Sequence, residues 1–252
     1  MSRRRRIYEG TGKTLFEGPE AGTLVQYFKD ELIDPADGRP VTVTGKGVLN
    51  NRISEYVMSR LNELGIPTHF LRRLNMREQL VRQVEIIPLI VSVRNAAAGE
   101  FAERFGIEPG TQLPRSIVEY YYKSNELGNP MITEEHITAF GWAQPTEIDE
   151  VLSLVLRIND FLTGLFLGTG LRLVDFTVEF GRLWQNDELR ILLADEISPD
   201  NCRLLDYASG RPIGLDLEGD MANDEPYQED ARRLGILPEG GPVDFKGSKL
   251  LQ

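Results

Sequence analysis

Apolar residues recur at two different spacings along the chain and divide it into strands and helices. Alternation over residues 7–30, broken by glycine turns, predicts antiparallel strands. Apolar residues at helical spacing from Val48 to Leu64 predict a helix that Gly65-Ile66-Pro67 ends. Segment 31–46 is expected to be a loop, because its Asp-Pro and Asp-Gly pairs favour turns. The same patterns predict further strands over 70–74, 81–93 and 117–123, and helices over 96–105, 133–140, 146–167 and 228–234.

These elements predict an α+β protein with two lobes, an N-terminal antiparallel sheet with one helix and a larger mixed α/β lobe. We expect the first lobe over residues 1–87, the larger lobe over 88–206, and a Gly- and acid-rich segment over 207–252 that packs on or trails the larger lobe. The hinge is expected near Glu85–Pro88. Ligand sites commonly form in clefts between such lobes, so the cleft is the expected place of a site.

A polar hairpin places several acidic residues together. Strand periodicity puts Asp175, Thr177 and Glu179 on one face of a strand. If Asn186-Asp187 is the centre of the turn that follows, position 195 pairs near 178. That register brings Asp195 close to Glu179.

Two carboxylates brought together without a basic partner repel each other, and a divalent cation is the usual remedy. Asp195 opens the run Asp195-Glu196-Ile197-Ser198-Pro199-Asp200 after a buried strand, and Arg203 follows it. Hard cations prefer oxygen ligands and phosphate prefers arginine, so the pattern favours a metal–phosphate site. A plain surface turn and a polar face on a solvated sheet are the alternatives.

Three further features are candidates for phosphate binding. Gly10-Thr11-Gly12-Lys13 either covers phosphates or simply closes a hairpin, and it is no P-loop because a strand follows it. Arg94 opens the predicted helix over 96–105, whose N-terminus would add donors for an anion. Lys123 shares a strand face with Glu119 and is either a phosphate ligand or half of a surface pair.

Composition narrows the class of protein. The net charge of −11 argues against a nucleic-acid binder, although Arg3–Arg6 is a basic run. The single cysteine, Cys202, rules out an internal disulfide and suits a reducing cytoplasm. It is interpreted as small filler rather than a nucleophile, since no histidine lies near it in sequence. The apolar helix candidate over 148–167 contains charged residues and is expected to be a core helix rather than a membrane span.

Taken in order, these segments resemble the SAICAR synthetase family, the phosphoribosylaminoimidazole-succinocarboxamide synthases of purine biosynthesis. The resemblance runs from about Arg6 to Asp206. Its motifs are Tyr8-Glu9-Gly10, Gly45-Lys46-Gly47-Val48-Leu49-Asn50-Asn51, Val93-Arg94-Asn95 with Ala97-Ala98-Gly99, Pro130-Met131, Phe140-Gly141-Trp142, Val174-Asp175-Phe176 and Ala194-Asp195-Glu196-Ile197-Ser198-Pro199-Asp200.

The resemblance implies a ligase that binds ATP and Mg²⁺ between two lobes. In this family the carboxylate of carboxyaminoimidazole ribonucleotide is phosphorylated, and the amine of aspartate then attacks the acyl phosphate. The partners implied are small-molecule substrates in the cytoplasm, with no nucleic acid and no membrane, and because members are commonly dimeric or larger a homodimer is expected. By position the implied residues are Gly10, Gly12, Lys13, Ile86, Lys123 and Glu179 for ATP; Glu179 and Asp195 for Mg²⁺; Lys123, Asp175 and Asp195 for catalysis; and Arg94, Glu100, Ser198 and Arg203 for substrate.

The chain also departs from the family pattern at substrate-facing positions. The departures are Thr11, Ile90, Glu100, Asn129 and Thr177, together with the replacement of an expected Asp-Lys-x-x-x-Arg segment after Arg203 by residues 208–224. Lysine to threonine at 177 and serine to glutamate at 100 shift the local charge by about −2, which a phosphate would feel. The alternatives are therefore a diverged paralogue with the same chemistry on another substrate, or a catalytically silent nucleotide-binding protein.

Overall fold

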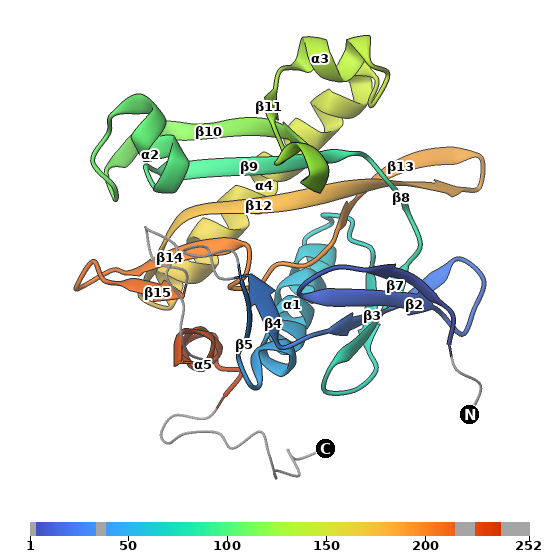
Figure 1. Ribbon diagram of the computed structural model, residues 1–252, viewed down its shortest axis with the longest axis horizontal. Coiled ribbons are helices and arrows are strands. Elements are labelled where there is room, and N and C mark those ends of the chain that lie inside the picture. Colours follow the sequence, from blue (N-terminus) through green and yellow to red (C-terminus); the bar gives the residue numbers. More distant parts are fainter. Residues whose placement is uncertain (1–3, 34–38, 215–224, 238–252) are drawn as a thin grey trace.

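The computed structural model describes residues 4–33, 39–214 and 225–237, and most of its strands lie in two sheets (Figure 1). The smaller sheet is antiparallel and has five strands in the order β1-β2-β3-β7-β6. The predicted N-terminal antiparallel strands are therefore confirmed. The bounds are β1 Arg6–Glu9, β2 Lys13–Glu17, β3 Thr23–Phe28, β6 Phe70–Arg73 and β7 Glu78–Arg82.

The segment expected to be a loop over 31–46 contains a short ribbon. Strands β4 (Glu31–Ile33) and β5 (Pro40–Thr42) pair with each other in antiparallel register. Leu32 lies opposite Val41, and both pack against the hydrophobic core. The expectation of a loop was wrong for these two strands, because it rested on the turn-forming pairs and not on the apolar contact between Leu32 and Val41. The pairs themselves, within residues 34–38, lie outside the described residues.

Helix α1 (Lys46–Glu63) packs against the smaller sheet. Its buried face includes Leu49, Ile53, Val57 and Leu61, which recur at helical spacing as the sequence predicts. The helix ends just before Gly65, which adopts φ +72°, a conformation that glycine reaches without the clash a Cβ would cause. The predicted helix and its end are confirmed.

The larger sheet has the order β11-β10-β9-β12-β14-β15, with β8 and β13 also paired to β12. Strand β12 is 15 residues long and joins the sheet's parts along its length, as Figure 1 shows. The strand predicted over 81–93 is in fact three strands, β7, β8 and β9, separated by short connections. The bounds are β8 Glu85–Ile86, β9 Leu89–Ala96, β10 Gln112–Tyr122, β11 Met131–Ile132, β12 Leu171–Gln185, β13 Glu188–Ala194, β14 Cys202–Asp206 and β15 Pro212–Gly214.

Four further helical segments lie in sequence between strands of the larger sheet. They are α2 (Gly99–Phe105), the 3-10 turn η1 (Asn125–Leu127), α3 (Glu134–Ala139) and α4 (Pro145–Gly168). The helix predicted from residue 96 begins only at Gly99, because β9 continues in the sheet to Ala96. Arg94 consequently lies within a strand, and the expectation that it opens a helix was wrong.

Helix α4 is the only helix in the described ranges that is long and apolar enough to cross a membrane. Its apolar residues Val151, Val155, Ile158 and Leu162 are buried, and the helix packs against β12. A core helix of a soluble protein passes the same test of length and composition, and α4 buries one face against β12.

One hydrophobic core joins the two sheets. It contains Leu49 and Ile53 from α1, Val91 from β9 and Phe176 from β12. Helix α5 (Glu225–Arg233) contacts α1 and β15, and Tyr227 on it is fully buried. The division of the chain into lobes at residues 87 and 206 stays a prediction.

Candidate active site

A cavity of about 410 Å³ opens between the two sheets. Apolar side chains from both sheets form part of its wall, among them Leu15 and Val81 from the smaller sheet and Ile86 and Ile90 from the larger one. Three cationic and two anionic side chains also line it. Of the residues singled out in the sequence, the cavity brings together Lys13, Ile86, Ile90, Lys123, Glu179 and Asp195.

The register of one hairpin places the two acidic residues. Strands β12 and β13 pair so that Glu179 lies opposite Ala194, and Asp195 follows directly. Asn186 and Asp187 form the turn with φ of 54° and 62°, the left-handed values that a two-residue hairpin of this kind requires. The predicted register is confirmed.

Each carboxylate has a lysine partner in this structure, so the expectation of acidic residues without a basic partner was wrong. Lys123 Nζ lies 2.5 Å from Glu179 Oε2. Lys13 pairs with Asp195 and also donates to Glu196 Oε2 at 2.9 Å. The reason is topological, because Lys13 reaches the hairpin from the smaller sheet. Charge repulsion between the carboxylates is thus relieved by lysine here.

The backbone of Asp195 is held in a left-handed turn with φ 64°. The Nε2 atom of His69 lies 2.7 Å from the carbonyl oxygen of Asp195, which can only accept, so Nε2 carries the donated proton. Burial, together with the nearby cations Lys13 and Arg82, lowers the pKa of the His69 imidazole to about 3. His69 is therefore a neutral donor at physiological pH.

The glycine-rich turn closes the hairpin between β1 and β2. The N–H of Gly10 donates to the carbonyl of Lys13 at 2.9 Å, and Lys29 Nζ donates to the Gly10 carbonyl at 3.1 Å. A Cβ placed on Gly12 would lie 3.6 Å from both Asp200 Oδ2 and Lys46 Nζ. In the structure this segment is the turn of a β-hairpin, which was one of the two alternatives. Lys13 at the end of the turn lines the cavity.

A second cluster lies on the same face of β12, toward the start of the strand. Asp175 Oδ2 accepts from Arg94 Nη1 at 2.6 Å and from Arg203 Nη1 at 3.1 Å. Burial alone would lower the pKa of the Arg94 guanidinium, but Asp175 and Tyr121 raise it well above its usual range. Four residues of extended strand, about 13 Å, separate Asp175 from Glu179. The structure therefore brings Arg94, Asp175 and Arg203 together, on the face of β12 that also carries Glu179.

The other predicted substrate residues lie differently. Ser198 is buried in the turn after β13, where its hydroxyl accepts from the N–H of Asp200 at 3.3 Å. Glu100 is exposed on α2, next to Gly99, over which the Arg203 guanidinium packs. Thr177 lies in β12 opposite Ser92, and Asn129 accepts from the N–H of Ser124. Most of segment 208–224 lies outside the described residues.

Comparison with known proteins decides the family. The family model for SAICAR synthetase matches residues 6–219. The chain belongs to the SAICAR synthetase family. A phosphoribosylaminoimidazole-succinocarboxamide synthase of Rhodospirillum centenum (strain ATCC 51521 / SW) is 66% identical over 254 residues, which cover 100% of both chains.

Solved structures agree with this membership. A crystal structure of phosphoribosylaminoimidazole-succinocarboxamide synthase from Ehrlichia chaffeensis is 39% identical with a TM-score of 0.85, covering 93% of this chain and 100% of that one. A SAICAR synthetase in complex with ADP is 33% identical with a TM-score of 0.83, covering 94% of this chain and 99% of that one. The predicted family and fold class are confirmed.

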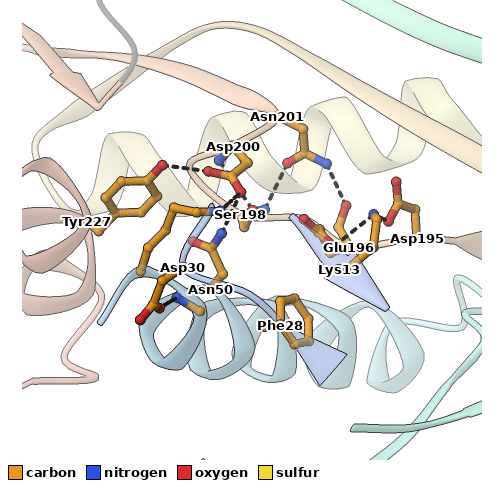
Figure 2. A network of polar contacts seen from close by, with 12 residues as sticks. Lys13, Phe28, Asp30, Asn50, Asp195, Glu196, Ser198, Asp200, Asn201 and Tyr227 are labelled. Carbon is orange, nitrogen blue, oxygen red and sulfur yellow. Dashed lines mark hydrogen bonds and ion pairs between the residues drawn. The ribbon is translucent and has the colours of Figure 1, made fainter. Parts of the chain in front are cut away.

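This SAICAR synthetase family member also contains a buried polar cluster that its sequence did not reveal. Asp200 accepts from Lys46 Nζ at 2.5 Å, from Asn50 Nδ2 at 2.8 Å and from the Tyr227 hydroxyl at 2.6 Å. Figure 2 shows Asp200, Asn50 and Tyr227 on one side of the turn around Ser198, and Lys13 with Asp195 and Glu196 on the other. Lys46, Asn50 and Asp200 belong to motifs that carry the family resemblance, but no local pattern pairs them.

Two findings bear on metal and thiol chemistry in this family member. Within the described parts of the chain, no three His, Cys, Asp or Glu side chains gather as a metal-binding group. Cys202 is buried, and burial, with Asp230 and Asp175 nearby, raises the pKa of its thiol well above the usual value. The interpretation of Cys202 as filler agrees with this, since a nucleophile needs a thiolate.

Proposed function

We propose that this chain is a phosphoribosylaminoimidazole-succinocarboxamide synthase that joins carboxyaminoimidazole ribonucleotide to L-aspartate with ATP and Mg²⁺. Full-length relatives at 58–66% identity carry the name of that synthase. The observation that carries the proposal is that five predicted nucleotide and metal residues line one cavity: Lys13, Ile86, Lys123, Glu179 and Asp195. We assign ATP to that cavity, and we also propose a homodimer and a cytoplasmic location.

The cavity suits a nucleoside triphosphate. Its apolar wall, which includes Ile86 and Ile90, offers a surface for a base, and Lys13 and Lys123 offer cations for phosphates. The lysines are already close to the carboxylates, so phosphate would compete for them with Asp195 and Glu179. We assign Lys13 and Lys123 to the phosphates, while Gly10 and Gly12 shape the turn that carries Lys13.

The carboxylates of Glu179 and Asp195 fit a magnesium ion, because both are oxygen donors on one cavity and neither is fully exposed. Mg²⁺ bound with ATP would neutralise phosphate charge during transfer. Displacing the lysines from these carboxylates would leave Lys13 and Lys123 free to meet phosphate oxygens. In this proposal the lysines exchange a carboxylate partner for a phosphate, and the carboxylates exchange a lysine for Mg²⁺.

The arginine cluster supports the ribonucleotide. Asp175 orients Arg94 and Arg203 by accepting a hydrogen bond from each, and fixed guanidinium groups suit the phosphate or carboxylate of the substrate. A carboxylate oxygen of the ribonucleotide attacks the γ-phosphorus of ATP, and ADP leaves. The aspartate amine then attacks the acyl carbon and loses a proton, phosphate leaves, and the amide forms. Glu100 beside Arg203 and Ser198 in the adjoining turn are assigned to the border of this subsite.

The alternatives of a changed substrate or a silent binder rest on the substituted positions. The full-length relatives support the synthase and lend no support to either alternative. The arginine pair that would bind the ribonucleotide is intact, and Thr177 lies between Asp175 and Glu179 without breaking the strand.

The test is a mass-spectrometric assay of the purified protein with ATP, Mg²⁺, carboxyaminoimidazole ribonucleotide and L-aspartate. We expect the succinocarboxamide and stoichiometric ADP, and neither without the ribonucleotide or without aspartate. ADP formed with other carboxylates or amines only would favour the changed substrate. ATP binding with no amide product from any pair would favour the silent binder.

A further inference from the structure

His69 is a buried histidine that contacts the backbone of a proposed metal ligand rather than a substrate. The residue is 5% exposed and lines the same cavity as Asp195. Its Nε2–H donates to the Asp195 carbonyl at 2.7 Å. Neither composition nor spacing marks this residue, because Asp195 lies 126 positions along the chain.

The segment around His69 is itself anchored to the end of β13. The N–H of Leu193 donates to the Pro67 carbonyl at 2.9 Å, and the N–H of His69 donates to the Leu193 carbonyl at 2.8 Å. These bonds form an isolated parallel bridge between Thr68 and Leu193. The imidazole therefore approaches Asp195 from a fixed backbone position rather than from a free loop.

Asp195 needs such support because it lies in the left-handed region. A φ of 64° is unfavourable for residues other than glycine, although aspartate and asparagine tolerate it better than most. Strand β13 ends at Ala194, so Asp195 has no ladder partner of its own in β12. The His69 hydrogen bond fixes the carbonyl on one side of this residue while its carboxylate lies on the cavity.

We propose that His69 is a positioning residue for Asp195, holding its carbonyl so that the carboxylate is presented to magnesium and nucleotide. This inference rests on the proposed function, in which Asp195 binds Mg²⁺. His69 would touch neither the metal nor the substrate. Partners of this outer kind typically change metal affinity about 10- to 100-fold when they are removed.

The variants separate the hydrogen bond from packing. His69→Phe keeps a planar ring but removes the donor, whereas the amide nitrogen of His69→Gln can reach the place of Nε2. Thr68→Val is the matched control, since Thr68 is buried on the same segment and its hydroxyl accepts from the Phe70 N–H instead. Asp195→Asn is the reference for loss of the metal ligand itself.

The measurement is the affinity for ADP by calorimetry on the full chain, once with Mg²⁺ and once with EDTA. The dissociation constant for ADP in EDTA, divided by the one in Mg²⁺, reports how much the metal strengthens ADP binding. We expect His69→Phe to lower that ratio at least about tenfold, with little change in the dissociation constant measured in EDTA. Asp195→Asn should lower the ratio as far or further. His69→Gln should recover most of the ratio, and Thr68→Val should keep it.

An unchanged ratio in His69→Phe, with a lowered one in Asp195→Asn, would overturn the role of His69 and leave the metal assignment standing. An unchanged ratio in Asp195→Asn would overturn the metal assignment and the role of His69 with it. If His69→Phe does not fold, His69→Asn replaces it, because its shorter side chain falls short of the carbonyl. Equal ratios in His69→Asn and His69→Gln would then contradict the proposal.

Discussion

The segment from Asp195 to Asn201 has a lysine–carboxylate cluster on each side, and the two clusters differ in their surroundings (Figure 2). On the cavity side, the Lys13 and Asp195 side chains are 22% and 19% exposed. On the other side, the Lys46 side chain is fully buried, while the Asp200 side chain is 23% exposed and also accepts hydrogen bonds from Asn50 and Tyr227. We call the cluster with the exposed lysine open and the cluster with the buried lysine closed, although the Asp195 and Asp200 carboxylates are about equally exposed.

The difference determines what each cluster can do. In the open cluster, a ligand or water can replace either partner, so the pair contributes little to stability and is free to exchange. In the closed cluster, loss of Asp200 would leave the fully buried Lys46 ammonium without its carboxylate. We infer that the cavity side binds ligand while the Asp200 side holds the turn against α1 and α5.

The largest expected effect is on turnover in the open cluster. Asp195→Asn should lower ADP release about a thousandfold or more, because one carboxylate is lost while asparagine still tolerates the left-handed turn. A coupled ADP assay measures it. Asp187→Asn is the matched control, an exposed aspartate at φ 62° on the hairpin tip, and should keep its rate. A normal rate in Asp195→Asn would remove this residue from the metal assignment.

The closed cluster should respond in stability instead. Lys46→Met is expected to lower the free energy of unfolding by about 1–3 kcal/mol, since Asp200 loses its cation but keeps the hydrogen bonds from Asn50 and Tyr227. The matched variant Lys123→Met, at a side chain 35% exposed, should cost less than about 1 kcal/mol. Urea unfolding followed by circular dichroism compares them. Equal losses in the two variants would erase the distinction between the clusters.

Buried His69 should make the free energy of unfolding depend on pH. Its pKa is lowered to about 3 in the folded protein from 6.5, so the unfolded chain binds the extra proton and stability falls as pH drops below 6.5. This group alone should cost about 1 kcal/mol between roughly pH 6 and pH 5. His69→Gln should remove that part of the slope, which urea titrations at several pH values would show. An unchanged slope would mean that the histidine is protonated in the fold.

The smallest effect concerns the link to α5. Tyr227→Phe should lower the free energy of unfolding by about 1–2 kcal/mol, because one hydrogen bond to Asp200 is lost while Lys46 and Asn50 remain. Tyr207→Phe, at an exposed tyrosine, should change nothing measurable. Thermal unfolding of both variants checks this. A neutral Tyr227→Phe would show that α5 is held by packing alone.

The features predicted well from sequence are local ones. The register that brings Asp195 to Glu179 follows from a two-residue turn and strand alternation, both readable within about twenty residues. Helix α1 follows from its apolar spacing and the glycine after it. The resemblance to the family supplied the identity of the cavity residues, which local patterns alone left open.

The features missed depend on contacts between distant parts of the chain. Lys13 reaches Glu196 across 183 positions, and Tyr227 reaches Asp200 from beyond the larger sheet. Nothing near Lys46 in sequence indicates that its ammonium is fully buried. The late start of α2 was missed because the pairing of β9 with its neighbours overrides the helical preference of three consecutive alanines.

The contrast between the clusters is tested most directly by lysine acylation followed by mass spectrometry, on the free protein and with ATP and Mg²⁺. We expect Lys13 and Lys123 to be modified in the free protein and protected about tenfold or more by the nucleotide. Lys46 should stay unmodified in both states. Nucleotide-independent modification of Lys13 and Lys123, or ready modification of Lys46, would contradict the assignment of one cluster to binding and the other to structure.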